Sequence, residues 1–500
     1  MKLVDFSRPF RASLLGVCAS AALALGCSTS STGSGAPAQV PWWTAGIPVP
    51  SSVQEAGDPD AGYQYLTHAG YFGCGLPSRF FAVAGPAATQ PGTTPEPLPG
   101  RDVSVNGSPL PYMWNLAQNS DGLDVVYQNC LTCHAGRFNG QLVIGLGNAD
   151  ADFTQDLGQA SSAAGLLSLL NPTPQEQAEL DKFLGRLKVI GPAAVMRTVG
   201  DNPAEMLATT FVSHRDVDTL AWSDTPFFTI PAVVDAPAGS SIASKVPPWW
   251  RMSKKAAQFY NAMGRGDHRR SEMLAGSLCI DTIDQANSID AHFNDVNAFV
   301  RSVKPPTYPF AIDRQLSAQG HEVFLGACSG CHGTYAPDRV VYPNLLIPHE
   351  TILTDDSVSL GGTSQYYGAQ EVDWYNRSWY GQVGHYVPQN GYIAPPLDGV
   401  WATAPYLHNG SVPDVATLLD SSKRPKFWRR VDHDTTHYDQ TALGFPWVTL
   451  SSGQNSPPSR VAVKNIYDTT QLSHSNTGHI FGDALSDDER RAVIEYLKTL

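Results

Sequence analysis

Apolar residues recur at helical spacing in three parts of the chain. Within Thr173–Val189 they fall on one face of a helix, at Leu180, Phe183, Leu184 and Leu187. At the end of the chain, Ser486–Glu489 has the Ser-x-x-Glu pattern of a helix N-terminal capping box, and the apolar positions after it are Val493, Leu497 and Leu500. Ser317–Phe324 is the third stretch. We predict a helix in each.

Between these stretches the chain is rich in residues that interrupt regular structure. It contains 38 prolines and 44 glycines in 500 residues, so we expect many ordered loops. The run from Gly85 to Gly100 is predicted to be an exposed loop, and Pro305-Pro306 is the best candidate for a domain boundary. The sequence therefore predicts a mainly α fold of short helices joined by long loops.

The first 26 residues have the features of a secretory signal peptide. The apolar stretch Ser13–Gly26 is too short to span a bilayer and follows three basic residues, Lys2, Arg8 and Arg11. Cys27 follows Ala24–Gly26, which is similar to a bacterial lipoprotein cleavage site without matching it fully. We expect export to the periplasm or cell surface, with a lipid on Cys27, or ordinary cleavage nearby as the alternative. Residues 27–40 are predicted to form a flexible tether.

The composition is acidic. Lys and Arg total 33 and Asp and Glu 46, so the net charge is −13; residues 1–26 carry three basic residues and one acidic, and removing them leaves −15. This charge argues against nucleic acid as a partner and favours small redox proteins as electron donors. After residue 26 the sequence has no apolar stretch long enough to cross a membrane, so we expect contact with the membrane only through a lipid on Cys27.

Two pentapeptides carry the strongest chemical signal in the chain. Cys130–His134 and Cys328–His332 both have the Cys-x-x-Cys-His spacing of a haem c attachment site. Two thiols bond to the vinyl groups of one porphyrin, and the adjacent histidine binds the iron as its proximal ligand. We therefore expect two covalently bound haems c, held by Cys130, Cys133, His134, Cys328, Cys331 and His332.

The other readings of these cysteines are weaker or stay open. A zinc ribbon needs two closely spaced cysteine pairs, whereas these pairs are 198 residues apart and each is followed directly by histidine. Of the four other cysteines, Cys18 lies in the signal segment and Cys27 at the lipid site. Cys74 and Cys279 could form a disulfide in an oxidising compartment or remain two buried thiols.

Two further motifs give the chain a family resemblance. The stretch Ala402–Val412 and the ending that starts at Leu485, together with two haem c sites, resemble the superfamily of bacterial di-haem cytochrome c peroxidases. That superfamily includes the di-haem enzyme that matures methylamine dehydrogenase and the di-haem rubber oxygenases. The wide separation of the two haem motifs is more similar to the rubber-oxygenase branch.

The resemblance implies two cytochrome c-like haem domains with long loops and insertions, which we place at 41–304 and 305–500. In the second domain, Gly320 and Phe324 would allow a close crossing with the last helix near Tyr496. The first domain lacks a clear leading helix, because turn and proline residues interrupt the approach to Cys130: Pro109, Pro111 and Asn119–Gly122.

The resemblance also implies a division of labour between the haems. The C-terminal haem would be six-coordinate and relay electrons, and the N-terminal haem would bind peroxide or dioxygen at an open position. Family peroxidases use a methionine before the last helix as sixth ligand, but all seven methionines here lie at or before residue 273. We predict His479 as the ligand opposite His332. His408 and, less well placed, His474 are alternatives; His408 could instead hydrogen-bond a haem propionate or a backbone carbonyl.

The candidates for the distal side of the N-terminal haem lie between the two motifs. Trp249 or Trp250 could lie between the haems or simply fill the core, and we choose Trp250 as a catalytic candidate. Peroxide cleavage needs a group that moves a proton between the two oxygens, for which His268 and Glu272 are the nearest candidates. A histidine among charged neighbours is, however, more often a surface or propionate contact. Dioxygen activation favours an apolar pocket, which could be lined by Phe259 and Tyr260.

These observations predict a class of protein rather than a substrate, and that class is a haem oxidoreductase. We prefer a peroxidase-like enzyme that activates peroxide at the N-terminal haem. A di-haem dioxygenase of the rubber-oxygenase type is one alternative. A pure electron-transfer cytochrome is another, and two histidine ligands at both irons would favour it. A non-catalytic assembly or sensing role is the last.

Overall fold

The computed structural model describes residues 42–81, 83, 96–159, 165–230, 242–336, 339–363 and 368–500. Trp42–Leu500 forms one compact unit. The expected signal segment (1–26), the tether (27–40) with Cys27, and most of the run from Gly85 to Gly100 lie outside the described residues. Among the helices that are described, none combines the length and apolar character needed to cross a membrane.

The fold is mixed α and β, so the prediction of a mainly α fold is wrong. Helices account for 37% and strands for 15% of the structure. Within the described ranges the strands form seven small sheets of two or three strands each. The strands are two to five residues long, and alternation over so few residues is hard to separate from loop sequence.

The hairpin of β5 (Trp114–Gln118) and β6 (Asp124–Gln128) shows why the strands were missed. The two strands pair antiparallel, and β2 (Leu76–Pro77) extends the sheet beside β6. Asn119–Gly122, which was expected only to interrupt the chain before Cys130, is the hairpin turn. The Asn119 side-chain oxygen accepts hydrogen bonds from two backbone N–H groups of the turn, each at 3.0 Å. Such an Asx turn joins strands rather than ending a helix.

The three predicted helices are present as α5 (Pro174–Ile190), α9 (Arg314–Ala327) and α15 (Asp487–Leu497). Capping boxes start two of them, with Thr173 and Glu176 at α5 and with Ser486 and Glu489 at α15. Each box satisfies backbone N–H groups at a helix start, which explains why both starts could be predicted.

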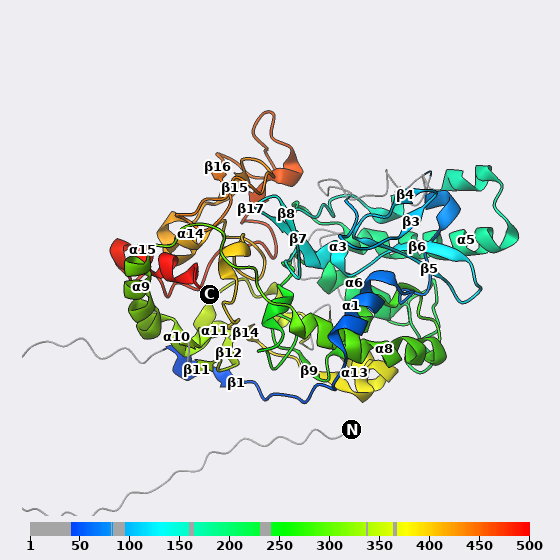
Figure 1. Ribbon diagram of the computed structural model, residues 1–500, viewed down its shortest axis with the longest axis horizontal. Coiled ribbons are helices and arrows are strands. Elements are labelled where there is room, and N and C mark those ends of the chain that lie inside the picture. Colours follow the sequence, from blue (N-terminus) through cyan, green and yellow to red (C-terminus); the bar gives the residue numbers. More distant parts are fainter. Residues whose placement is uncertain are drawn as a thin grey trace, which may run out of the picture. The chain divides into compact units, whose positions relative to one another are not determined.

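Helices α9 and α15 cross at the expected position. A Cβ on Gly320 would lie 1.8 Å from the carbonyl oxygen of Ala492, so only glycine allows the two backbones to approach this closely. Beside the crossing, the rings of Phe324 and Tyr496 have centroids 5.1 Å apart. Figure 1 shows the two helices next to each other near the C-terminus, and their crossing fixes the start of the second haem motif.

The N-terminal half is built around α8 (Ile283–Ser302), against which α1 (Pro59–His68) packs (Figure 1). Helix α7 (Arg269–Leu274) packs against α8 as well. A disulfide joins Cys74 and Cys279, so these two cysteines are paired rather than free. Helices α6 (Ala204–Ser213) and α13 (Ala369–Arg377) also pack together. The disulfide therefore fixes the chain just before α8, and the packing of α1 and α7 fixes α8 itself.

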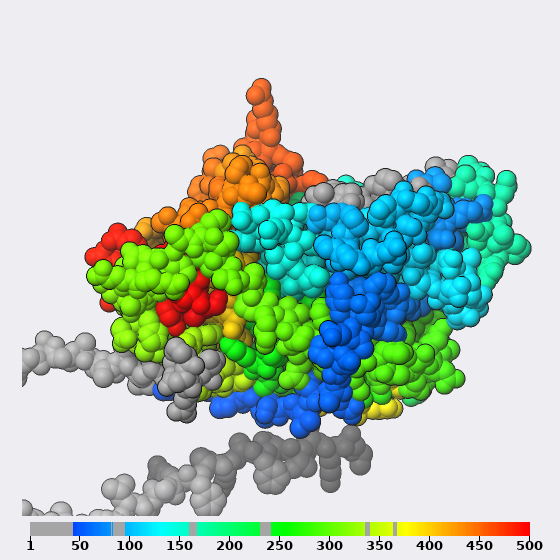
Figure 2. All heavy atoms as spheres, viewed as in Figure 1, coloured from blue at the N-terminus to red at the C-terminus, as the bar shows by residue number. Residues whose placement is uncertain are grey.

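Two sheets join strands from either side of the proline pair at 305. β1 (Ile47–Pro48) pairs with β12 (Leu345–Pro348), and β9 (Gly264–Gly266) pairs with β13 (Gly384–Tyr386). In Figure 2 the orange and red chain gathers on one side of the visible face and most of the cyan chain on the other. The two-domain division at 305 stays a prediction.

The remaining described elements are short. They are η1 (Trp42–Ala45), β3 (Ser104–Val105), β4 (Ser108–Pro109), α3 (Leu131–His134), β7 (Ala135–Phe138), β8 (Gln141–Ile144), η2 (Gly165–Leu170), η3 (Gly191–Ala194), η4 (Trp249–Arg251), η5 (Ser277–Cys279), α10 (Ser329–His332), β10 (Thr334–Ala336), β11 (Arg339–Val341), α11 (His349–Ile352), α12 (Ser357–Leu360), η6 (Trp379–Gln382), β14 (Gly391–Ile393), η7 (Val400–Ala402), α14 (Val415–Leu419), η8 (Ser421–Lys423), β15 (Phe427–Arg430), β16 (Trp447–Thr449), η9 (Val463–Asn465) and β17 (Tyr467–Asp468).

Candidate haem sites

The second Cys-x-x-Cys-His motif lies at the wall of a cavity. The C-terminal end of α9 leads directly into α10, so that Cys328, Cys331 and His332 all line this cavity. Phe324 of α9 and Leu497 of α15 line it as well. The helix crossing therefore presents two thiols and an imidazole to one enclosed, largely apolar space.

His479 faces His332 across this cavity. The centroids of the two imidazole rings are 6.2 Å apart. An imidazole nitrogen binds a metal at about 2 Å, and half an imidazole ring adds roughly 1 Å on each side, so the separation fits one iron bonded to both rings. The Nδ1 of His332 donates to the carbonyl oxygen of Pro395 at 2.8 Å, which leaves Nε2 as the ligand atom.

Both rings are suited to bind a metal because they are neutral at neutral pH. Burial lowers the pKa of His479 to about 3, with further lowering by His332 and Arg424. Burial also lowers the pKa of His332, and the Pro395 carbonyl partly offsets it. A neutral imidazole offers the lone pair that a protonated one lacks.

The polar groups of the cavity fit a haem. Lys245 and Arg251 both line it. Burial lowers the pKa of Lys245 well below its usual range, and the buried Nη2 of Arg251 has no hydrogen-bond partner in the protein. Buried cations need a counter-charge, and a haem brings two propionates. Cysteines, histidines and cations thus match the three kinds of contact that a haem c makes.

The other two histidine candidates are engaged elsewhere. His408 lines the same cavity, but its Nε2 lies 3.1 Å from the hydroxyl of Tyr392, whose ring stacks on it at 4.2 Å. His474 is buried with its Nε2 2.8 Å from a carboxylate oxygen of Asp201. His479 is the histidine whose ring the structure brings against that of His332.

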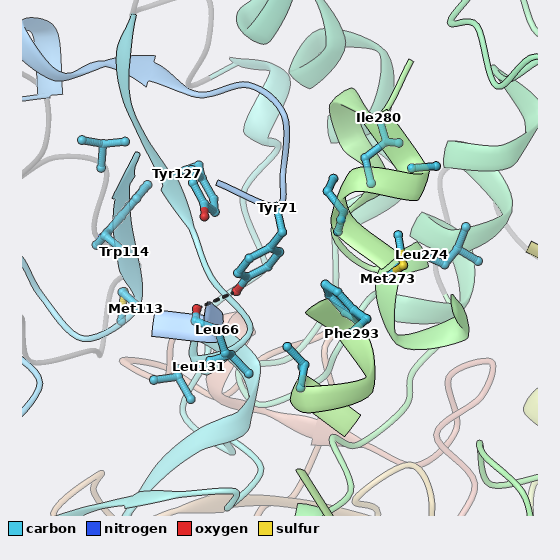
Figure 3. Close-up of a cluster of buried hydrophobic side chains, with 14 of the residues drawn as sticks. Leu66, Tyr71, Met113, Trp114, Tyr127, Leu131, Met273, Leu274, Ile280 and Phe293 are labelled. Carbon is cyan, nitrogen blue, oxygen red and sulfur yellow. Dashed lines mark hydrogen bonds between the residues drawn. The ribbon is translucent and has the colours of Figure 1, made fainter. Parts of the chain in front are cut away.

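The first motif occupies the short helix α3 and has different surroundings. The backbone N–H of Cys130 donates to the hydroxyl oxygen of Tyr71 at 3.2 Å, and that hydroxyl donates to Leu66 at 3.1 Å (Figure 3). The side chain of Asn202 donates to the sulfur of Cys133 at 3.3 Å. The hydroxyl of Tyr71 also lies 3.5 Å from the sulfur of Cys130, so residues distant in sequence contact both sulfurs of the pair.

An indole, and not a second imidazole, lies beside His134. The ring of Trp249 stacks on it with centroids 4.8 Å apart and planes inclined by 18°. Burial lowers the pKa of His134 to about 4, partly offset by the nearby carbonyl of Pro247. The ring is neutral and can bind iron, but its aromatic neighbour cannot, because an indole N–H is a donor only.

Three consecutive residues of η4 connect the two candidate sites. Trp249 contacts His134, and Arg251 lines the cavity of the second motif. Between them, the Nε1 of Trp250 donates to the carbonyl oxygen of Asp398 at 2.8 Å, and its side chain is 2% exposed. Trp250 is thus a core contact between the halves, while Trp249 touches the proximal histidine.

His268, directly before α7, and Glu272, within it, form a polar cluster in which His268 is buried and Glu272 is half-buried. Burial, then Lys255 and Arg301, lower the pKa of His268 to about 3. Its side chain is only 1% exposed, yet neither ring nitrogen has a partner in the protein. The pKa of Glu272 is raised to about 8 by burial and by Asp267. His268 is therefore no surface residue, and Glu272 carries a proton at neutral pH.

The α7 cluster lies near the first motif. Burial raises the pKa of the Cys130 thiol to about 11, and the Glu272 carboxyl adds to this at longer range. Leu131 and Met273, the sequence neighbours of these two residues, belong to one buried cluster, which Figure 3 shows between the chain around the hairpin and the helices α7 and α8. Phe259 is 36% exposed, and Tyr260 lines the other cavity.

Sequence reasoning missed the residues that support the histidines. A repeated signal could have found two of them: each proximal histidine lies beside the carbonyl of the first residue of a Pro-Pro pair, Pro247 for His134 and Pro395 for His332. Tyr71 and Asn202 carry no such signal. Their contacts with the thiols depend on the tertiary fold alone.

Comparison with known proteins agrees with a haem site in the second half. A family model described as RoxA-like, cytochrome c-like matches residues 391–429. The uncharacterized protein y4iJ of Sinorhizobium fredii (strain NBRC 101917 / NGR234) is 25% identical over 565 residues, covering 92% of this chain and 88% of its own. The uncharacterized protein y4iM of the same organism is 28% identical over 238 residues, covering 40% of this chain and 52% of its own.

The matched segment supports a c-type haem oxidoreductase with covalently bound haem c. It contains residues of the cavity wall from Tyr392 to Leu419, among them Pro395, whose carbonyl oxygen accepts the hydrogen bond of His332. The match is compatible with a relationship to the di-haem rubber oxygenases. The peroxidase superfamily stays a prediction, as does the second haem.

Proposed function

We propose that the chain is a di-haem oxidoreductase in which the C-terminal haem relays electrons and the N-terminal haem activates peroxide. Cys328 and Cys331 would bind the C-terminal haem, with His332 and His479 as its axial ligands. Cys130, Cys133 and His134 would bind the N-terminal haem. The observation that carries the proposal is the imidazole of His479, whose ring lies 6.2 Å from that of His332. Among the described residues no second imidazole is in ring contact with His134, and the Trp249 indole stacks on the face of that ring.

The residues near the N-terminal haem are suited to moving a proton. When bound, a haem with an open position supplies the iron that binds an oxygen-containing oxidant. Glu272 holds a proton on its carboxyl at neutral pH, because its pKa is about 8, and can deliver it to the far oxygen of peroxide. His268, with both ring nitrogens unpartnered, can accept the proton of the near oxygen.

Electrons would enter at the C-terminal haem and cross through η4. Arg251 lines the cavity there and Trp249 stacks on the other proximal histidine, so that one turn of chain spans the two sites. Two axial histidines leave no position for substrate, and they favour outer-sphere electron transfer. The acidic chain supports small basic redox proteins as donors.

Turnover with the full-length holoprotein tests this function. We expect peroxide-dependent oxidation of a reduced small cytochrome, without consumption of dioxygen. Absence of peroxide reactivity in both redox states would contradict the peroxidase function. If in addition neither iron accepts an added ligand, the electron-transfer alternative is the correct one.

A second candidate function is favoured by the RoxA-like match. In this function the N-terminal haem activates dioxygen and cleaves an alkene, as in the di-haem rubber oxygenases. Consumption of dioxygen with cleavage of polyisoprene, independent of added peroxide, would support it over the peroxidase function.

We further propose that the protein acts in the periplasm or at the cell surface, held by a lipid on Cys27. The Cys74–Cys279 disulfide supports an oxidising compartment. Membrane fractionation tests the anchor: the wild-type chain should sediment with membranes, and a Cys27→Ala variant should not. An equal distribution of both would contradict lipid attachment.

A further inference from the structure

The guanidinium of Arg424 holds the chain segment that carries His479. Its Nη1 donates to the carbonyl oxygens of Asn476 at 2.7 Å and of Gly478 at 2.6 Å. Its Nη2 donates to the carbonyl oxygen of His479 itself at 3.0 Å. Three carbonyls within four residues are therefore fixed by one side chain.

The same guanidinium is anchored on the other side to the end of α14. Nη2 donates to the carbonyl oxygen of Leu418 at 3.0 Å, and Nε donates to that of Thr417 at 3.3 Å. A guanidinium has five N–H donors in a rigid plane, and here five carbonyls accept. Arg424 thus connects the His479 segment to α14, which lines the cavity, and all five of its N–H groups are hydrogen-bonded.

The backbone of this segment needs such support because it is strained. His479 has a φ of 45°, in the left-handed region that residues with a Cβ avoid, because the Cβ comes too close to the following carbonyl oxygen. Gly478 precedes it with a φ of 71°, and a Cβ there would lie 2.2 Å from the backbone of Leu353 and Thr354. The N–H of His479 donates to the carbonyl oxygen of Ile352 at 2.8 Å.

Arg424 also places a positive charge beside the segment that carries His479. Asp483 is the carboxylate that acts on it at longer range and partly offsets its charge, but its oxygens accept hydrogen bonds from Ser421 at 2.8 and 2.6 Å. The carbonyl partners are neutral, so they do not cancel the charge. A cation near an iron favours the reduced over the oxidised state, because reduction removes one positive charge from the site.

We propose that Arg424 is a positioning residue that holds His479 against the C-terminal haem iron and raises the reduction potential of that haem. The inference rests on the proposed ligation by His479. The two contributions are separable, because one substitution removes the hydrogen-bonding plane and keeps the charge, and a second removes both.

Two variants of the full-length holoprotein separate them. Arg424→Lys keeps the charge but offers three donors without the planar arrangement. We expect part of the C-terminal haem to become high-spin, with the potential of the remaining low-spin fraction unchanged. Arg424→Met removes both features, so the high-spin fraction should grow and the potential of the low-spin fraction should fall. Spectroelectrochemical titration and electron paramagnetic resonance measure both quantities.

Arg101→Lys is the matched control. Arg101 is another buried arginine that donates to backbone carbonyls, those of Thr67, Leu110, Pro111 and Trp114, at 2.7 to 3.1 Å in the N-terminal half. Its replacement should lower overall stability and leave the spin state and potential of the C-terminal haem unchanged.

Wild-type spin state and potential in both Arg424 variants would overturn the inference. An equal spectral change in the Arg101 variant would also overturn it, because loss of overall stability alone would then explain the change in the Arg424 variants. If His479→Ala also keeps a low-spin C-terminal haem, the proposed ligation itself fails; if His479→Ala changes the spectrum and the Arg424 variants do not, only the role of Arg424 fails. Added imidazole should restore the low-spin spectrum of Arg424→Met if a detached His479 is the cause.

Discussion

The two haem-attachment regions share a pentapeptide pattern and differ in nearly everything around it. At Cys328–His332, the crossing of α9 and α15 opens onto a cavity in which a second imidazole lies 6.2 Å from the first. At Cys130–His134, an indole stacks on the histidine, and the titratable side chains of His268 and Glu272 lie at the nearby helix α7. The same pentapeptide pattern therefore has different distant neighbours in the two regions, and in our proposal those neighbours decide what each haem does.

The difference can first be tested by removing one attachment site at a time. Cys130→Ala with Cys133→Ala, and separately Cys328→Ala with Cys331→Ala, should each reduce the haem content from two per chain to one. A pyridine haemochrome assay against protein concentration measures this. Two haems in either double variant, or one in the wild-type protein, would show that one region binds no haem.

The sixth ligand of the C-terminal haem provides the next test. His479→Ala should convert one of the two haems from low-spin to high-spin, because the second axial nitrogen is lost. His408→Ala is the matched control, since that ring lines the same cavity but bonds to Tyr392. Electron paramagnetic resonance of the oxidised protein distinguishes them, and a change confined to the His408 variant would assign the ligand to His408.

The acid–base group of the N-terminal region is tested by Glu272→Gln. Turnover with peroxide should fall about 100-fold, as expected for loss of a general acid–base group. The raised pKa of about 8 means that wild-type activity should be full at neutral pH and decline as pH rises through about 8. The variant should lose this alkaline decline.

Glu371→Gln is the control for this effect. Burial raises the pKa of Glu371 to about 8 as well, but its carboxylate accepts a hydrogen bond from Thr209 at 2.5 Å and it belongs to α13. Equal losses of turnover in the two variants would mean that any buried glutamate matters equally, and that Glu272 has no special role.

A smaller effect is expected at Gly478. Gly478→Ala should destabilise the protein and partly release the low-spin state, because the Cβ meets backbone atoms at 2.2 Å. Gly107 has a similar φ of 77° with nothing near its Cβ position, so Gly107→Ala should cost only the strain, about 1 kcal/mol. Thermal unfolding followed at the haem absorbance measures both, and equal midpoints would contradict a special need for glycine at 478.

The parts of the molecule that the sequence predicts are those coded by residues close together. The helix from Thr173 and the capping box at Ser486 follow from local pattern, and both are confirmed. The crossing at Gly320 was implied by the family resemblance and is also confirmed. The hairpin turn at Asn119–Gly122 was missed because two five-residue strands give too little alternation to outweigh the expected helices.

Much of the candidate site depends instead on contacts between distant residues. His479 could be chosen because no methionine follows residue 273. Arg424 could not, since it acts on backbone carbonyls 52 to 55 residues away, and carbonyls belong to every residue type. The burial of His268 likewise depends on packing, because its charged sequence neighbours indicate the surface.

Carbon monoxide titration of the fully reduced, full-length protein tests the central claim most directly. Carbon monoxide binds a ferrous haem at an open or weakly held position. We predict one molecule bound per chain of two haems, and none in the variant with Cys130→Ala and Cys133→Ala. Binding to neither haem, binding to both, or undiminished binding in that double variant would contradict the functional difference between the two regions.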